Sequence, residues 1–272
     1  MPGLTNLAPG VYAWLQEPAR HGTTNAGVVL DEDGATVIDT LMLPSQTAEL
    51  VDAVEALGFR IRRCVYTSSH FEYVGGSSKV WSAARYGRAL TSGHLDQPAN
   101  PDNLQRLFPD HAAELHEPVT RPVSHVVDEA AWLSGAVVAV PTQGQQAQNL
   151  VAQVPGANVV FAGAMCCFGV TPLCFDGDPA AWADSLDDVV GWGEVIVPGC
   201  GPVGGHVEVR TLQAYLRACV ETAEADKGAL PSGPWDGWAD RHFDEVNVER
   251  AALVARGEDS VPPSMLRLLG LG

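Results

Sequence analysis

The chain has 272 residues and a formal net charge of -17, with 46% hydrophobic and 18% charged residues. This composition is typical of a globular protein that can bury a substantial core, and it argues against a disordered chain. The negative charge argues against nucleic acid and anionic membranes as partners, because both would be repelled. The sequence shows no signal peptide and no long apolar segment, so we expect a cytoplasmic protein with no membrane partner.

The first half of the chain is predicted to alternate strands with helices. Apolar and β-branched runs predict strands at 10–15, 24–30, 35–39 and 61–66. Apolar residues at helical spacing predict one helix at 45–57. The last strand leads into the segment Thr67-Ser68-Ser69-His70-Phe71-Glu72-Tyr73-Val74-Gly75-Gly76. A strand that ends in polar groups and a glycine turn directs those groups to the edge of a sheet, where α/β proteins place their chemistry.

The second half is predicted to contain a second sheet flanked by further helices. We expect a short strand at 88–91, an insertion at about 94–120, a second sheet from 122 to 162, helices at 179–190 and 208–225, a strand at 195–197, and a helical extension at about 231–272. Two β-rich halves with helices between them predict an α+β protein with the four-layered αββα sandwich architecture. We expect a single domain over 1–272 with its core at about 8–225.

Four short motifs occur in a characteristic order along this core. They are Val37-Ile38-Asp39-Thr40, Thr67…His70…Glu72…Gly75-Gly76, Phe161-Ala162-Gly163 and Val197-Pro198-Gly199-x-Gly201-Pro202. Together they resemble the framework of the metallo-β-lactamase superfamily. The resemblance implies the αββα fold and an enzyme that acts on small acyl or organic substrates.

The metal ligands of that superfamily are mostly replaced in this sequence. The positions of the first metal carry Ser68, His70 and Gln145, those of the second carry Glu72, Tyr73 and Cys200, and the bridging position carries Ala164. Serine, amide and alanine side chains are poor or impossible zinc ligands. The sequence therefore predicts no binuclear centre and no cofactor. The alternative is one zinc or iron ion bound by His70, Glu72 and Cys200, with help from His206 or His21.

The polar groups that remain predict general acid/base chemistry. His70 and Glu72 leave the same strand end and can act as an acid/base pair, and Tyr73 can donate to a developing oxyanion. The alternative for His70 is a structural hydrogen bond to Asp39 that holds the loop. Cys200 is either a nucleophile or a thiol that fills the space of a lost histidine. A serine–histidine hydrolase built on Ser68, Ser69 and His70 is less favoured, because sequence neighbours seldom face each other.

The sequence therefore predicts an enzyme that lacks the binuclear metal centre and acts on a small organic or acyl substrate as a lyase, cyclase or hydrolase. The predicted catalytic residues are His70, Glu72, Tyr73 and Cys200, and the predicted pocket residues are Ser68, Ser69, Asp39, Gln145, His21 and His206. Two alternatives stay open, a mononuclear metal-dependent hydrolase of the thioesterase or lactonase type and a non-catalytic pseudoenzyme that binds a ligand.

Overall fold

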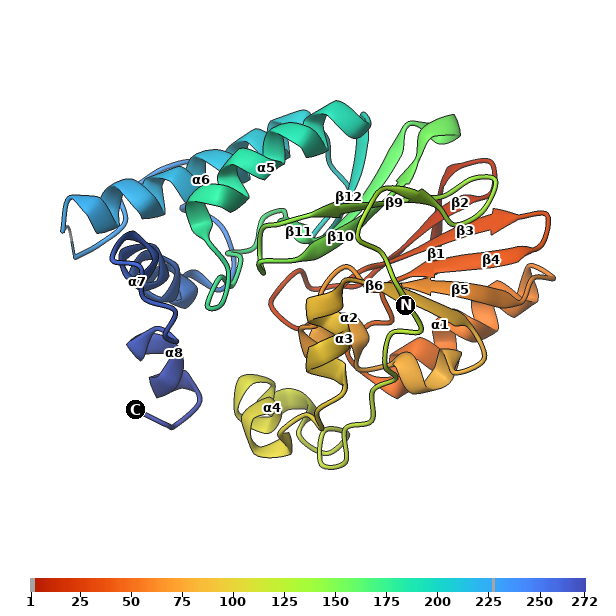
Figure 1. Ribbon diagram of the computed structural model, residues 1–272, viewed down its shortest axis with the longest axis horizontal. Coiled ribbons are helices and arrows are strands. Elements are labelled where there is room, and N and C mark those ends of the chain that lie inside the picture. The colour runs from red at the N-terminus through yellow and green to blue at the C-terminus, as the bar shows by residue number, and fades with distance from the viewer. Residues whose placement is uncertain (1–2, 227) are drawn as a thin grey trace.

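Two β-sheets form the centre of the computed structural model, which describes residues 3–226 and 228–272 (Figure 1). The first sheet has seven strands in chain order, β1 (Gly3–Ala8), β2 (Val11–Leu15), β3 (Ala26–Asp31), β4 (Gly34–Ile38), β5 (Ile61–Val65), β6 (Ala84–Gly87) and β7 (His125–Val126). The second has five in the spatial order β12 (Val195–Cys200), β11 (Val159–Cys167), β10 (Asn149–Val154), β9 (Val138–Thr142) and β8 (Ala131–Trp132). Each sheet contains both parallel and antiparallel pairs.

Alternation of side chains along the strands separates an inner core from an outer core. Val29 and Ile38 point between the sheets and pack with Phe161 of the second sheet. Their neighbours Val28 and Val37 point to the opposite face and pack beneath helix α1 (Pro44–Ala56). Because successive side chains of a strand point to opposite faces of the sheet, both faces of the first sheet carry apolar side chains, and both are buried.

Helices α5 (Pro179–Trp192) and α6 (His206–Glu224) cover the outer face of the second sheet (Figure 1). Trp182 is fully buried there, and its indole N–H donates to the Met165 carbonyl at 3.0 Å. With α1 on the far side of the first sheet, the layers run helix, sheet, sheet, helix. The predicted four-layered αββα sandwich is confirmed.

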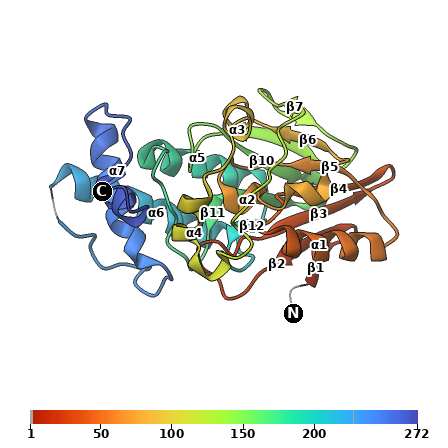
Figure 2. The same ribbon diagram turned by 90° about the horizontal axis from the view of Figure 1, so that it is seen from below.

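The remaining helices lie around one end of the sandwich. They are α2 (Phe71–Val74), α3 (Ala89–Leu95), α4 (Pro101–Leu107), α7 (Asp244–Ala255) and α8 (Pro263–Leu268). Both views place α7 at the end of the molecule far from β4 (Figure 2). No helix in the described part of the chain is long and apolar enough to cross a membrane.

Two sequence-based expectations about the strands are wrong, and one strand was not expected. The strand expected at 88–91 is instead the start of α3. The strand that pairs with β5 is β6, and this pairing ends where Val65 lies opposite Tyr86, before residue 88. The second sheet begins at β8 rather than at residue 122, because β7 pairs with β6 in the first sheet. Strand β1 was not anticipated, and it forms the edge of the first sheet beside β2.

Candidate active site

The polar segment after β5 is held in place by close backbone packing. His70 has extended backbone angles and directly precedes the short helix α2. At Gly76, a Cβ atom would lie 1.6 Å from the Thr47 hydroxyl and 2.3 Å from the Thr40 carbonyl. Only glycine allows this approach, so the glycine pair fixes how the segment turns against the start of α1.

Asp39 anchors the beginning of the segment through Thr67. Its carboxylate accepts hydrogen bonds from the Thr67 amide at 2.8 Å and from the Thr67 hydroxyl at 2.7 Å. Burial raises the pKa of Asp39 to about 7, although the two hydrogen bonds oppose this. The alternative role of His70, a structural hydrogen bond to Asp39, is not seen, because the two ring nitrogens face Asp176 and Glu72 instead. Asp39 therefore orients the strand end and does not contact His70.

Thr67 in turn connects the two sheets. Its hydroxyl accepts a hydrogen bond from the Ala164 amide at 3.1 Å, and its carbonyl accepts one from the Leu150 amide at 3.1 Å. Gly163 has a φ of +49°, and a Cβ atom there would lie 2.2 Å from the Thr67 hydroxyl. The start of the polar segment is thus fixed against both layers at once.

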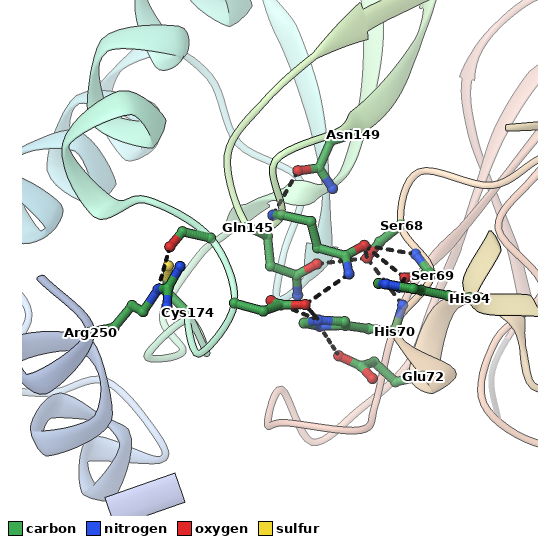
Figure 3. Close-up of polar contacts among 12 residues, drawn as sticks. Ser68, Ser69, His70, Glu72, His94, Gln145, Asn149, Cys174 and Arg250 are labelled. Atoms are coloured by element: carbon green, nitrogen blue, oxygen red, sulfur yellow. Dashed lines mark hydrogen bonds and ion pairs between the residues drawn. The ribbon is translucent and has the colours of Figure 1, made fainter. Parts of the chain in front are cut away.

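The imidazole of His70 lies between two carboxylates (Figure 3). Its Nε2 is 3.1 and 3.2 Å from the two carboxylate oxygens of Asp176, and its Nδ1 is 3.8 Å from Glu72 Oε1. The ring stacks on Phe175, with centroids 4.8 Å apart and planes at 9°. His70 and Glu72 are buried, whereas the Asp176 side chain is 29% exposed. The three side chains form a line from the interior to the surface, and Asp176 is at its outer end.

The charges along this line reinforce one another. Burial alone lowers the pKa of His70, but the neighbouring Asp176 and Glu72 carboxylates outweigh it and give a raised pKa. Burial of Asp176 acts to raise its pKa, yet the imidazolium and hydrogen bonds from His70 and Gln146 give a lowered pKa. Both directions favour an imidazolium–carboxylate pair between His70 and Asp176.

A second group of polar side chains surrounds Gln146. Its Oε1 accepts from the Ser69 amide at 3.0 Å and lies 2.9 Å from the Ser68 hydroxyl, while its Nε2 donates to Asp176 Oδ2 at 2.9 Å. The Ser68 hydroxyl also lies 2.8 Å from Gln145 Oε1. The structure therefore joins the predicted pocket residues Ser68, Ser69 and Gln145 to Asp176 through Gln146.

A cleft of about 630 Å³ opens beside this group. Its walls come from α3, from the loops at 143–147 and 176–178, and from α7 with the segment that follows it. His94, Gln146 and Asp176 line one side. Arg250 lines another, and its guanidinium donates to the Gly177 carbonyl at 2.6 Å. The cleft has the size of a small-molecule site.

The positions that correspond to the second metal of the resembled superfamily surround a different and much smaller space. Glu72, Tyr73 and Cys200 line a cavity of only about 10 Å³, which holds one water at most. The Cys200 thiol donates to the Arg20 carbonyl at 3.0 Å, and burial raises its pKa to about 12. Burial also raises the pKa of the Tyr73 phenol well above its usual range.

These donors do not fit a zinc or iron ion. Both nitrogens of His70 already face carboxylates, and burial raises the pKa of the Cys200 thiol, which donates to two backbone carbonyls. Within residues 3–226 and 228–272, no three histidine, cysteine, aspartate or glutamate side chains converge in a way that could hold a metal ion. The alternative set of His70, Glu72 and Cys200 therefore does not form a coordination shell.

The two further histidines predicted for the pocket lie apart from the cleft. His21 stacks on Phe108 with ring centroids 5.1 Å apart, and it borders the small cavity beside Glu72. Burial lowers the pKa of His21. His206 lies at the start of α6, where its Nε2 hydrogen-bonds to the Gly193 carbonyl at 3.0 Å. Neither histidine belongs to the line from Glu72 to Asp176.

The polar residues of the cleft that sequence reasoning missed include Asp176, Gln146 and His94, which join the segment after β5 to the cleft. Gln146 neighbours the predicted Gln145, so its position was within reach. Asp176 follows β11 in a loop with no motif, and His94 lies in the insertion, where no pattern indicated a role. Only the folded chain brings them to the end of β5.

Comparisons with known proteins agree with this architecture. The family model described as "Metallo-beta-lactamase superfamily" matches residues 19–187. The fold is similar to that of the metallo-beta-lactamase FIM-1 from Pseudomonas aeruginosa in its mono-zinc form, at 20% identity and a TM-score of 0.61 over 79% of this chain and 94% of that one. It is also similar to a metallo-beta-lactamase from Hirschia baltica, at 19% identity and a TM-score of 0.60 over 79% and 97%.

Proposed function

The chain belongs to the metallo-beta-lactamase superfamily, and from this premise we propose that it is an enzyme that acts on a small organic or acyl substrate by general acid/base chemistry without a binuclear metal centre. One observation carries the proposal. Asp176 faces the 630 Å³ cleft while both of its carboxylate oxygens lie within 3.2 Å of His70 Nε2. A substrate in the cleft would therefore contact a carboxylate that is coupled to a buried imidazole.

The His70–Asp176 pair can exchange one proton with the substrate. When His70 is protonated, Asp176 can take the proton from Nε2 and, as the carboxylic acid, donate that same proton to the substrate, so that the pair acts as a general acid. When His70 is neutral, the same path runs in reverse and the pair acts as a base. Glu72 supports the charged form of His70 from behind. Phe175 keeps the ring in one plane by stacking.

The mononuclear hydrolase is less well supported, because the donor set does not fit a metal. Metal-activated water, the usual nucleophile of metallohydrolases, would then be missing. The geometry around His70 supports proton transfer instead. Lyase, cyclase and metal-free hydrolase reactions all need such a transfer.

The test is turnover of a panel of small esters, thioesters, lactones and amides by the purified 272-residue chain. His70→Ala and Asp176→Asn should each lower kcat roughly a hundred- to ten-thousand-fold, the usual contribution of a positioned acid or base. His116→Ala is the matched control, because His116 is exposed and its imidazole hydrogen-bonds to the Ala113 carbonyl of its own loop. Full activity of folded His70→Ala would contradict the proposal. No turnover across the panel would favour the ligand-binding alternative.

A further inference from the structure

We propose that Ser69 and His94 form a nucleophile–base pair and that the enzyme hydrolyses carboxylic esters through an acyl group carried on Ser69. This inference rests on the proposed function, because the leaving group and the attacking water exchange their protons with the His70–Asp176 pair. It assigns a covalent step to two residues outside that pair.

The Ser69 hydroxyl has two side-chain partners, and the His94 imidazole is the nearer of them. Ser69 Oγ lies 2.7 Å from His94 Nδ1 and 3.0 Å from Gln146 Oε1. Gln146 Oε1 already lies within reach of two other donors, the Ser69 amide and the Ser68 hydroxyl. The Ser68 hydroxyl can donate to Gln145 Oε1 at 2.8 Å instead, so Ser69 has two acceptors, and His94 Nδ1, in the tautomer that leaves this nitrogen unprotonated, is the nearer one. This is the contact that a base needs to activate a serine hydroxyl.

The orientation of Gln146 is fixed by its partners. Its Nε2 faces Asp176, which as a carboxylate can only accept, and its Oε1 faces the Ser69 amide, which can only donate. One amide group therefore connects the serine–histidine pair to the His70–Asp176 pair. One member of each pair, His94 or Asp176, lines the same cleft, and so does Gln146.

The reaction has two steps, acylation of Ser69 and hydrolysis of the acyl group, and both residue pairs take part. Ser69 Oγ bonds to the ester carbonyl carbon and its proton moves to His94 Nδ1, while the bond to the leaving oxygen breaks and that oxygen takes a proton from His70 through Asp176. A water then bonds to the acyl carbon and loses a proton through Asp176 to the neutral His70. The bond to Ser69 Oγ breaks, and Ser69 recovers its proton from His94. Ester and water yield acid and alcohol, and every residue returns to its first state.

The test is covalent labelling of the whole chain with a fluorophosphonate, followed by peptide mass spectrometry. We expect one phosphonyl group, on Ser69, and none on Ser69→Ala. His94→Ala should be labelled about a hundredfold more slowly, in line with the loss of a general base. Ser92→Ala, on the same helix as His94, is the matched control and should be labelled like the wild type. The wild-type result is decisive even if a variant fails to fold.

Three results would overturn the proposal: wild-type protein that stays unlabelled, a label on another residue, or folded His94→Ala that reacts at the wild-type rate. Hydrolysis of p-nitrophenyl acetate by His70→Ala, measured in parallel, separates this failure from failure of the proposed function. An unlabelled Ser69 with His70-dependent hydrolysis would remove the serine–histidine pair alone. A labelled Ser69 with hydrolysis that does not need His70 would remove the role of the His70–Asp176 pair alone.

Discussion

Replacing Asp39 by asparagine should change how the stability of the protein depends on pH. Asp39 is 1% exposed, and its pKa is raised from 3.8 to about 7 in the folded chain. A carboxyl group whose pKa is raised on folding stabilises the folded state at low pH, and this contribution is lost as the pH rises toward 7. Between pH 3.8 and 7, each pH unit lowers the free energy of unfolding by ~1.4 kcal/mol through this group. The wild type should therefore lose about 3 kcal/mol of its free energy of unfolding between pH 4.5 and 8.

Asparagine cannot ionise, so Asp39→Asn should not show this loss. The variant leaves the Thr67 hydroxyl proton without its acceptor, which costs about 1 kcal/mol at every pH. We therefore expect the variant to be slightly less stable than the wild type at pH 4.5 and more stable at pH 8.

Urea unfolding followed by tryptophan fluorescence at several pH values measures this difference. Asp52→Asn, which changes an exposed carboxylate, is the control and should leave the pH dependence unaltered. A constant difference between the wild type and Asp39→Asn from pH 4.5 to 8 would refute the reasoning, because it would mean that Asp39 ionises normally in the folded chain.

Three further predictions concern packing, the thiol and metal. Gly76→Ala should lower the free energy of unfolding by more than ~3 kcal/mol, because its Cβ would lie 1.6 Å from the Thr47 hydroxyl. Gly93→Ala is the control: its Cβ would have no atom within 4 Å, and the change should raise the free energy of unfolding by roughly 0.5–1 kcal/mol. Equal urea midpoints for the two variants would contradict this. Cys200→Ser should lose less than about tenfold in kcat, and iodoacetamide should react slowly with Cys200, because burial raises its pKa to about 12; rapid alkylation that tracks inactivation would show a thiol mechanism. Protein purified without chelator should hold less than one equivalent of zinc or iron by elemental analysis, and a full equivalent would restore the metallohydrolase alternative.

Local patterns in the sequence predicted the framework well. The alternation in β3 and β4 and the helical spacing in α1 follow from which faces are buried, and a single sequence records this directly. The position of the candidate site, at the end of β5, was inferred from polar groups after an apolar strand. The αββα arrangement required the resemblance of four motifs in addition to the local patterns.

The partners within the site could not be predicted in the same way. Asp176 meets His70 across 106 residues of chain, and His94 meets Ser69 from an insertion 25 residues away. Nothing in the local pattern of either residue records which distant loop it will contact. Cys200 is the last residue of β12, beyond the strand expected at 195–197, and its hydrogen bonds to backbone carbonyls depend on the segment 20–23, which no motif marks.

The pairing of His70 with Asp176 is the central claim, and the most direct test is an NMR titration of the His70 imidazole in the wild type and in Asp176→Asn. The structure predicts that wild-type His70 keeps its proton above the ordinary histidine pKa of 6.5, because Asp176 and Glu72 face its two nitrogens. Removing the Asp176 charge should shift the titration to lower pH, since burial then dominates. A wild-type His70 that titrates at or below 6.5, or a titration that Asp176→Asn leaves unchanged, would contradict the account.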